Sequence, residues 1–143
     1  MNKAVATAFV LVMSTTLHAE SLEERKFWKG QMDYLSQNLE AASKSCDVKF
    51  TFDWIDKPKL REQADKTQAS PNGICGAVID EVEALCRDDA DSKASVKAKI
   101  KGFTCGWSNP RSLDMKGGIL QYLGNNEQAN FSDWAKPWIE KHL

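Results

Sequence analysis

Four cysteines constrain the fold of this chain more than any other feature of its sequence. Cys75 and Cys86 flank a segment whose apolar residues recur with helical spacing, which places both cysteines on one predicted helix. Eleven residues of helix separate two Cα atoms by about 16 Å, whereas a disulfide requires Cα atoms within about 7 Å. These two cysteines therefore cannot bond to each other, and each must pair with Cys46 or Cys105. We expect both bonds to be structural, linking this helix to an earlier helix and to a later strand.

The N-terminal segment indicates where such disulfides would form. Residues 1–19 combine one lysine, an apolar stretch over residues 4–13 and a small residue, Ala19, before Glu20. This pattern is typical of a secretory signal peptide, and its apolar stretch is shorter than the about 20 residues that a membrane span needs. We expect a periplasmic or secreted protein without a membrane span, in which disulfides persist.

Length and charge favour a single exported domain over residues 20–143. Lys3 is the only charged residue before residue 20, so the remaining chain has 18 basic and 20 acidic residues. A nucleic-acid-binding domain usually has a clear excess of basic residues. The near-neutral balance therefore argues against a nucleic-acid partner.

Apolar residues spaced three and four apart predict two long helices, over residues 22–45 and 71–87. The first begins at Ser21, which has the sequence form of a capping box. A short amphipathic helix is predicted over residues 131–143. Residues 59–69 are polar and give no prediction of regular structure beyond one loose helical turn.

Alternation of apolar and polar residues predicts the strands. They are expected over residues 48–54, 96–107, 113–116 and 119–123. The alternation shifts by one residue at Gly102, which indicates a bulge, and Gly117-Gly118 is a two-residue hairpin signal. The sequence therefore predicts a small α+β domain with two helices packed on a mainly antiparallel sheet of about four strands.

Two groups of residues are candidates for binding. Lys97, Lys99 and Lys101 would point the same way on a strand, with neighbouring ammonium groups about 7 Å apart. Such a row suits an acidic protein partner or an anionic glycan. Trp107, beside a glycine at a strand end, and Trp138, beside a proline, are the tryptophans most available for contact with a ligand.

The sequence offers little support for catalysis or metal binding. The only histidine after residue 19 is His142, next to the C-terminus, and no Cys-x-x-Cys pair is present. The acids considered for carboxylate-pair chemistry are Asp53, Asp80, Glu81 and Glu83. We expect no cofactor and no metal.

These observations lead to one expectation about function and two alternatives. The expectation is an exported, non-enzymatic binding module that engages a protein partner as an inhibitor, immunity protein or accessory factor. The first alternative is a small carboxylate-dependent hydrolase acting on envelope glycan. The second is a ligand carrier with a cavity between helix and sheet.

Overall fold

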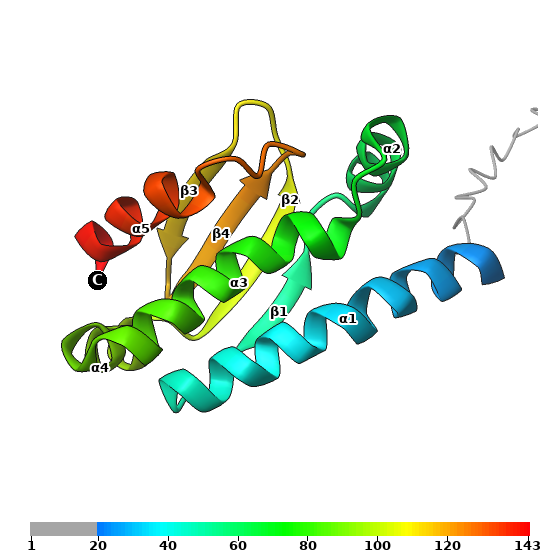
Figure 1. Cartoon of the computed structure of the whole chain (residues 1–143). Helices are drawn as coiled ribbons and strands as arrows, with labels where there is room; N and C mark the ends of the chain where they lie inside the picture. The colour runs from blue at the N-terminus through cyan, green and yellow to red at the C-terminus, as the bar shows by residue number, and fades with distance from the viewer. Residues whose placement is uncertain (1–19) are drawn as a thin grey trace, which may run out of the picture.

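The computed structural model describes residues 20–143, and the predicted signal peptide at residues 1–19 lies outside the described part of the chain. Figure 1 shows how helices and one sheet are arranged in this part, which confirms the predicted α+β class. The helices are α1 (Leu22–Cys46), α2 (Lys57–Thr67), α3 (Pro71–Asp88), α4 (Ala90–Lys99) and α5 (Phe131–His142). The strands are β1 (Thr51–Trp54), β2 (Gly102–Trp107), β3 (Ser112–Lys116) and β4 (Ile119–Gly124).

The strands form one mixed sheet in the order β1-β2-β4-β3. Strand β2 runs parallel to both β1 and β4, and only the pairing of β3 with β4 is antiparallel. The prediction of a mainly antiparallel sheet is therefore wrong. Three helices connect β1 to β2, and such a long crossover allows the second strand to run parallel to the first. The hairpin at Gly117 and Gly118 is present, and both glycines have the positive φ that its turn requires.

Residues 90–99 depart most clearly from the sequence prediction, because they form helix α4 and not part of a strand. Val96 and Ile100 are buried and Ala98 between them is exposed, so the buried positions repeat every four residues. Asp89 caps the helix, and hydrogen bonds from the side chain and backbone of Ser92 lower the pKa of the Asp89 carboxyl. The shift in the apolar–polar alternation at Gly102 consequently marks the point where strand β2 begins after helix α4. No bulge is needed to explain it.

Helix α2 also differs from the prediction, because the sequence predicted at most one loose helical turn in this region. Asp56 caps it by accepting a hydrogen bond from the Lys59 backbone N–H at 3.2 Å, and Pro58 lies in its first turn. Only Leu60 and Ala64 are buried in this helix. The apolar stripe is therefore too short to give a clear periodic signal.

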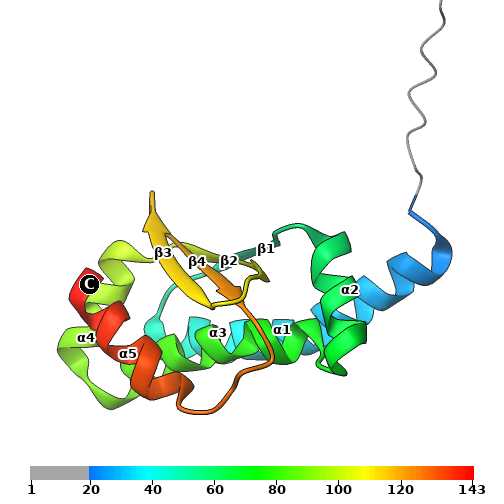
Figure 2. The same ribbon diagram turned by 90° about the horizontal axis from the view of Figure 1, so that it is seen from above.

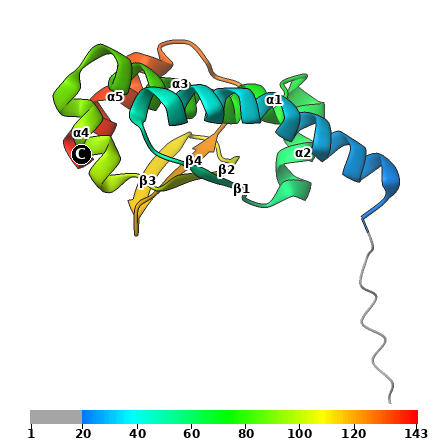
Figure 3. The same cartoon turned by 90° about the horizontal axis from the view of Figure 1, so that it is seen from below.

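Helices α1, α3 and α5 lie on one side of the sheet, and α2 and α4 lie at its two opposite ends, as Figures 2 and 3 show from two directions. Helices α1 and α3 run side by side across this side, and α5 packs beside α3. The long helices predicted from periodicity are confirmed, as is the short C-terminal helix. Within the described residues, the other face of the sheet carries no helix.

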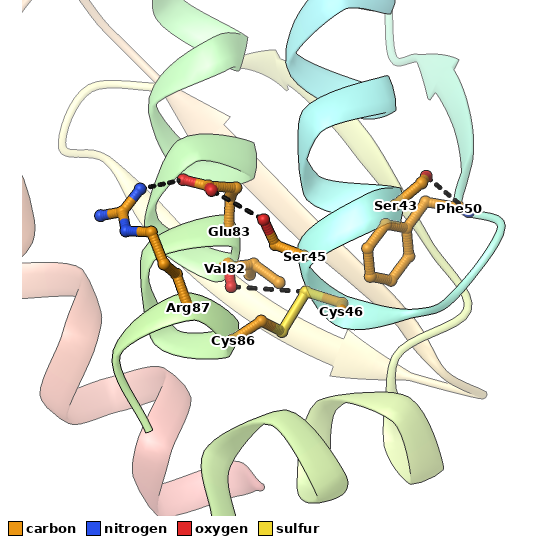
Figure 4. The surroundings of a disulfide bond; sticks show 8 residues. All are labelled: Ser43, Ser45, Cys46, Phe50, Val82, Glu83, Cys86 and Arg87. Carbon is orange, nitrogen blue, oxygen red and sulfur yellow. Dashed lines mark hydrogen bonds and ion pairs between the residues drawn. A yellow bond between two sulfur atoms is a disulfide. The ribbon is translucent and has the colours of Figure 1, made fainter. Parts of the chain in front are cut away.

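Two disulfides tie the helix layer together and to the sheet. Cys46 pairs with Cys86, which joins α1 to α3 with a Cα–Cα distance of 5.0 Å (Figure 4). Cys75 pairs with Cys105, which joins α3 to β2 with a Cα–Cα distance of 5.8 Å. The prediction that Cys75 and Cys86 do not bond to each other is confirmed, and so is the linkage of their helix to a helix and a strand.

One buried side-chain polar atom of residues 20–143 lacks a hydrogen-bond partner, the hydroxyl oxygen of Tyr122. The ring of Tyr122, on β4, packs against Phe131 and Trp134 of α5, with ring centroids 5.4 Å and 6.2 Å away. Burial raises the pKa of Tyr122 to about 12, although the positive charge of Arg111 opposes part of this rise.

We expect Tyr122→Phe to raise the free energy of unfolding by about 1 kcal/mol, because the variant no longer buries an unpaired hydroxyl. The stability of the wild-type protein should also fall between about pH 10 and pH 12, because there the unfolded tyrosine ionises and the folded one stays protonated. The variant should lack this part of the decline. Urea titrations of both proteins at neutral and alkaline pH would measure the difference, and a less stable variant at neutral pH would contradict the expectation.

Candidate binding surface

The face of the sheet opposite α1 and α3, which we term the open face, is not covered by a helix of residues 20–143. Cys105 points toward α3 through its disulfide, so its neighbours Thr104 and Gly106 point toward the open face. One row across this face contains Asp53, Thr104, Gln121 and Asp114. The side chains of Ile119 and Leu123 are half-buried on the same face. Sheets built mainly of parallel strands are usually covered on both faces, so this face is a candidate for contact with another molecule.

Four exposed lysines gather at one end of the sheet, and we call them the lysine end: Lys49, Lys99, Lys101 and Lys116. The backbone N–H of Lys101 donates to the Gly118 carbonyl at 2.7 Å, and its carbonyl accepts from Thr51 N–H at 3.2 Å. Lys101 therefore lies between β1 and the turn that joins β3 to β4. Lys116 is the last residue of β3 before that turn, and Lys49 precedes β1 by two residues.

The charges of the lysine end are not neutralised by the protein itself. Within residues 20–143, none of these four lysines forms an ion pair. Lys97, in contrast, pairs with Asp47, and this hydrogen bond lowers the pKa of the Asp47 carboxyl. A surface depression of about 540 Å³ borders Lys49; it is lined by the last turns of α1 and the residues that follow, and includes Glu40 and Asp47. The lysine end is therefore a positively charged surface suited to an anionic group.

The structure separates the three lysines that the sequence placed on one strand. Lys97 and Lys99 lie on α4, and Lys101 lies between α4 and β2, so the predicted row of ammonium groups is wrong. Residues two apart on a helix do not share a face. The role of all three lysines in binding stays a prediction. Lys99 and Lys101 belong to the lysine end, whereas Lys97 forms an exposed ion pair with Asp47.

The two tryptophans singled out from the sequence do not join the lysine end. Trp107 is the last residue of β2, at the far end of the strand from Lys101, and packs against the core. Trp138 lies on α5, where its ring stacks on His142 with centroids 3.7 Å apart. The structure thus does not bring the five predicted binding residues together, and whether either tryptophan binds a ligand stays a prediction.

Lys49 and Lys116 are the residues that the sequence reasoning missed. Each alternates with apolar neighbours, Val48 and Phe50 in one case and Met115 in the other, so each could be assigned to the polar face of a strand. No local sequence pattern shows that the segments containing Lys49 and Lys116 lie on either side of Lys101. That relation depends on the strand order.

The acids considered for hydrolysis do not converge on a common cleft. Asp53 lies on the open face, whereas α3, which carries the other three, lies on the opposite side of the sheet. Asp80 accepts a hydrogen bond from Asn38 at 2.6 Å. Glu83 accepts from Ser45 and from Arg87, each at 2.8 Å, beside the Cys46–Cys86 disulfide (Figure 4). The hydrogen bonds from Asn38 and Ser45 link α1 to α3, and none of these contacts supports the hydrolase alternative.

Comparison with known protein families, curated proteins and solved structures gives no match to this chain. Within residues 20–143, no cluster of three or more potential metal ligands is present. No helix of the same range combines the length and apolar character that a membrane span requires. Inference about function therefore depends on the geometry of the surface.

Proposed function

We propose that this protein is an exported, non-enzymatic binding module, periplasmic or secreted, whose lysine end engages an acidic protein partner. The observation that carries the proposal is the grouping of four exposed lysines, none in an ion pair within residues 20–143, from three separate stretches of the chain at one end of the sheet. Charged surfaces of this kind steer a partner of opposite charge and fix its orientation. Two disulfides support an oxidising compartment.

The direct test reverses the charge of the lysine end and compares it with an equal reversal elsewhere. The test variant is Lys99→Glu/Lys101→Glu/Lys116→Glu. The matched control is Arg25→Glu/Lys26→Glu/Lys59→Glu, because these three residues are also exposed, form no ion pair within residues 20–143 and lie on α1 and α2. Both variants change the net charge equally.

Poly-L-glutamate serves as a defined acidic probe, with binding followed by NMR chemical shifts. We expect it to shift the signals of Lys101 and Lys116 and to bind the lysine-end variant about tenfold more weakly than the wild type. The control variant should retain the wild-type affinity within about twofold, and added salt should weaken binding to both. Equal losses in the two variants would show a general charge effect and would refute a specific site.

The same pair of variants then tests whether the natural partner is a protein. The tagged protein is incubated with envelope extract, and bound proteins are quantified by mass spectrometry. An acidic protein retained by the wild type and by the control, but lost from the lysine-end variant, is the expected result. Recovery of glycan alone would favour the alternative partner class.

A further inference from the structure

Both edge strands of the sheet have one outward backbone N–H that is held by an aspartate. In β1, Thr51 and Ile55 donate their N–H groups to Lys101 and Cys105 of the β2 side. Alternate residues of a strand point their N–H groups to opposite sides. The N–H of Trp54 therefore points away from the sheet, where a further strand would pair.

That outward N–H of Trp54 is occupied. It donates to Oδ1 of Asp53 at 2.8 Å. Just before β1, the N–H of Phe50 donates to the Ser43 hydroxyl of α1 at 3.4 Å (Figure 4). Side chains thus hold the N–H groups of Phe50 and Trp54 on this edge. The N–H of Phe52, between them, also points outward and has no hydrogen-bond partner within residues 20–143.

The opposite edge has the same arrangement. Lys116 and Ile119 close the two-residue hairpin, so Asp114 pairs with Gln121 in the same hydrogen-bonded register and the N–H of Met115 points outward. This N–H donates to Oδ1 of Asp114 at 2.9 Å, whereas the outward N–H of Leu113 has no such partner within residues 20–143. Asp53 and Asp114 occupy the two ends of a single row across the sheet, Asp53–Thr104–Gln121–Asp114.

We propose that Asp53 and Asp114 protect both edges of the sheet against strand addition, whether by a second copy of this chain or by a partner's strand. An added strand needs the outward N–H groups as donors, and it would also bring its backbone carbonyls against the two carboxylates. Exposed edge strands otherwise invite association between identical chains, and charged side chains on an edge are one natural protection. This inference does not depend on the lysine end.

The test uses single and double substitutions in the full mature chain, with sedimentation velocity as the measurement. Asp53→Ala opens only the β1 edge and Asp114→Ala only the β3 edge, so each single variant should form a dimer in which two copies pair through one edge. The double alanine variant has two open edges and should form larger assemblies. The wild type should remain a monomer at the same concentration.

Asparagine variants separate the hydrogen bond from the charge. Asp53→Asn/Asp114→Asn keeps an oxygen acceptor at both positions, so this protein should associate much less than the double alanine variant. Hydrogen exchange of the Trp54 and Met115 amides then locates the contact, because edge pairing in the alanine variants should protect both amides. Circular dichroism confirms that each variant is folded, and a single variant suffices where the double variant fails to fold. Folded alanine variants that remain monomeric, or a wild type that dimerises through either edge, would overturn the proposal.

Discussion

Replacing Cys75 and Cys105 together with alanine is expected to lower the free energy of unfolding by about 3–4 kcal/mol. The two cysteines are 30 residues apart in the chain, and their bond removes the entropy of closing that loop from the unfolded state. Both side chains are completely buried, where the bond connects α3 to β2, the only strand that pairs with two parallel neighbours. The bond therefore holds the helix layer on the centre of the sheet.

Urea denaturation followed by circular dichroism measures this loss, with the Cys46→Ala/Cys86→Ala variant as the comparison. That disulfide spans 40 residues, so a loop-entropy effect predicts a loss of similar size. Removal of both bonds should leave little of the stability of a typical domain. A Cys75→Ala/Cys105→Ala protein as stable as the wild type would show that burial alone holds α3 on the sheet.

Gly102→Ala is expected to destabilise the protein by about 3 kcal/mol, because a methyl group at this position has no space. A Cβ atom placed there would lie 2.7 Å from the backbone oxygen of Thr51 and would overlap the Thr51 hydroxyl. The hydroxyl could rotate away, but the backbone oxygen belongs to β1 and cannot. The substitution would push β1 away from β2 and weaken the hydrogen bond from Thr51 N–H to the Lys101 carbonyl.

Two variants make this prediction specific. Gly30→Ala is the matched control on α1: a Cβ there meets no atom within 4 Å, and alanine in a helix is favoured over glycine by about 1 kcal/mol. That variant should therefore be more stable than the wild type. Thr51→Ala/Gly102→Ala should recover only part of the loss, because the backbone overlap remains. Full recovery would assign the whole effect to the Thr51 side chain.

Local periodicity accounts for the features that the sequence predicted correctly. The apolar stripes of α1 and α3 extend over many turns, and the hairpin at Gly117-Gly118 requires two residues that adopt positive φ. The exclusion of a bond between Cys75 and Cys86 needed only the rise of a helix. Each of these inferences depends on residues close together in the chain.

Short elements defeated the same reasoning. The end of α4 and its C-cap fit a strand by the alternation of Val96, Ala98 and Ile100. Only the burial of Val96 and Ile100, with Ala98 exposed, shows that the true repeat is four residues. In α2, Leu60 and Ala64 are too few to reveal a period. The strand directions escaped the same reasoning, because β2 and β4 pair in parallel although β3 lies between them in the chain.

The sequence by itself determined the α+β class, the long helices and the linkage of α3 to both a helix and a strand. Tertiary structure alone decided the parallel pairing of β2 with β1 and β4, the open face and the lysine end. Lys49, Lys101 and Lys116 come from distant parts of the chain and meet only because β2 and β4 lie between β1 and β3. That order arises from pairing between residues far apart in sequence and from burial of one sheet face against α1 and α3, which no local pattern encodes.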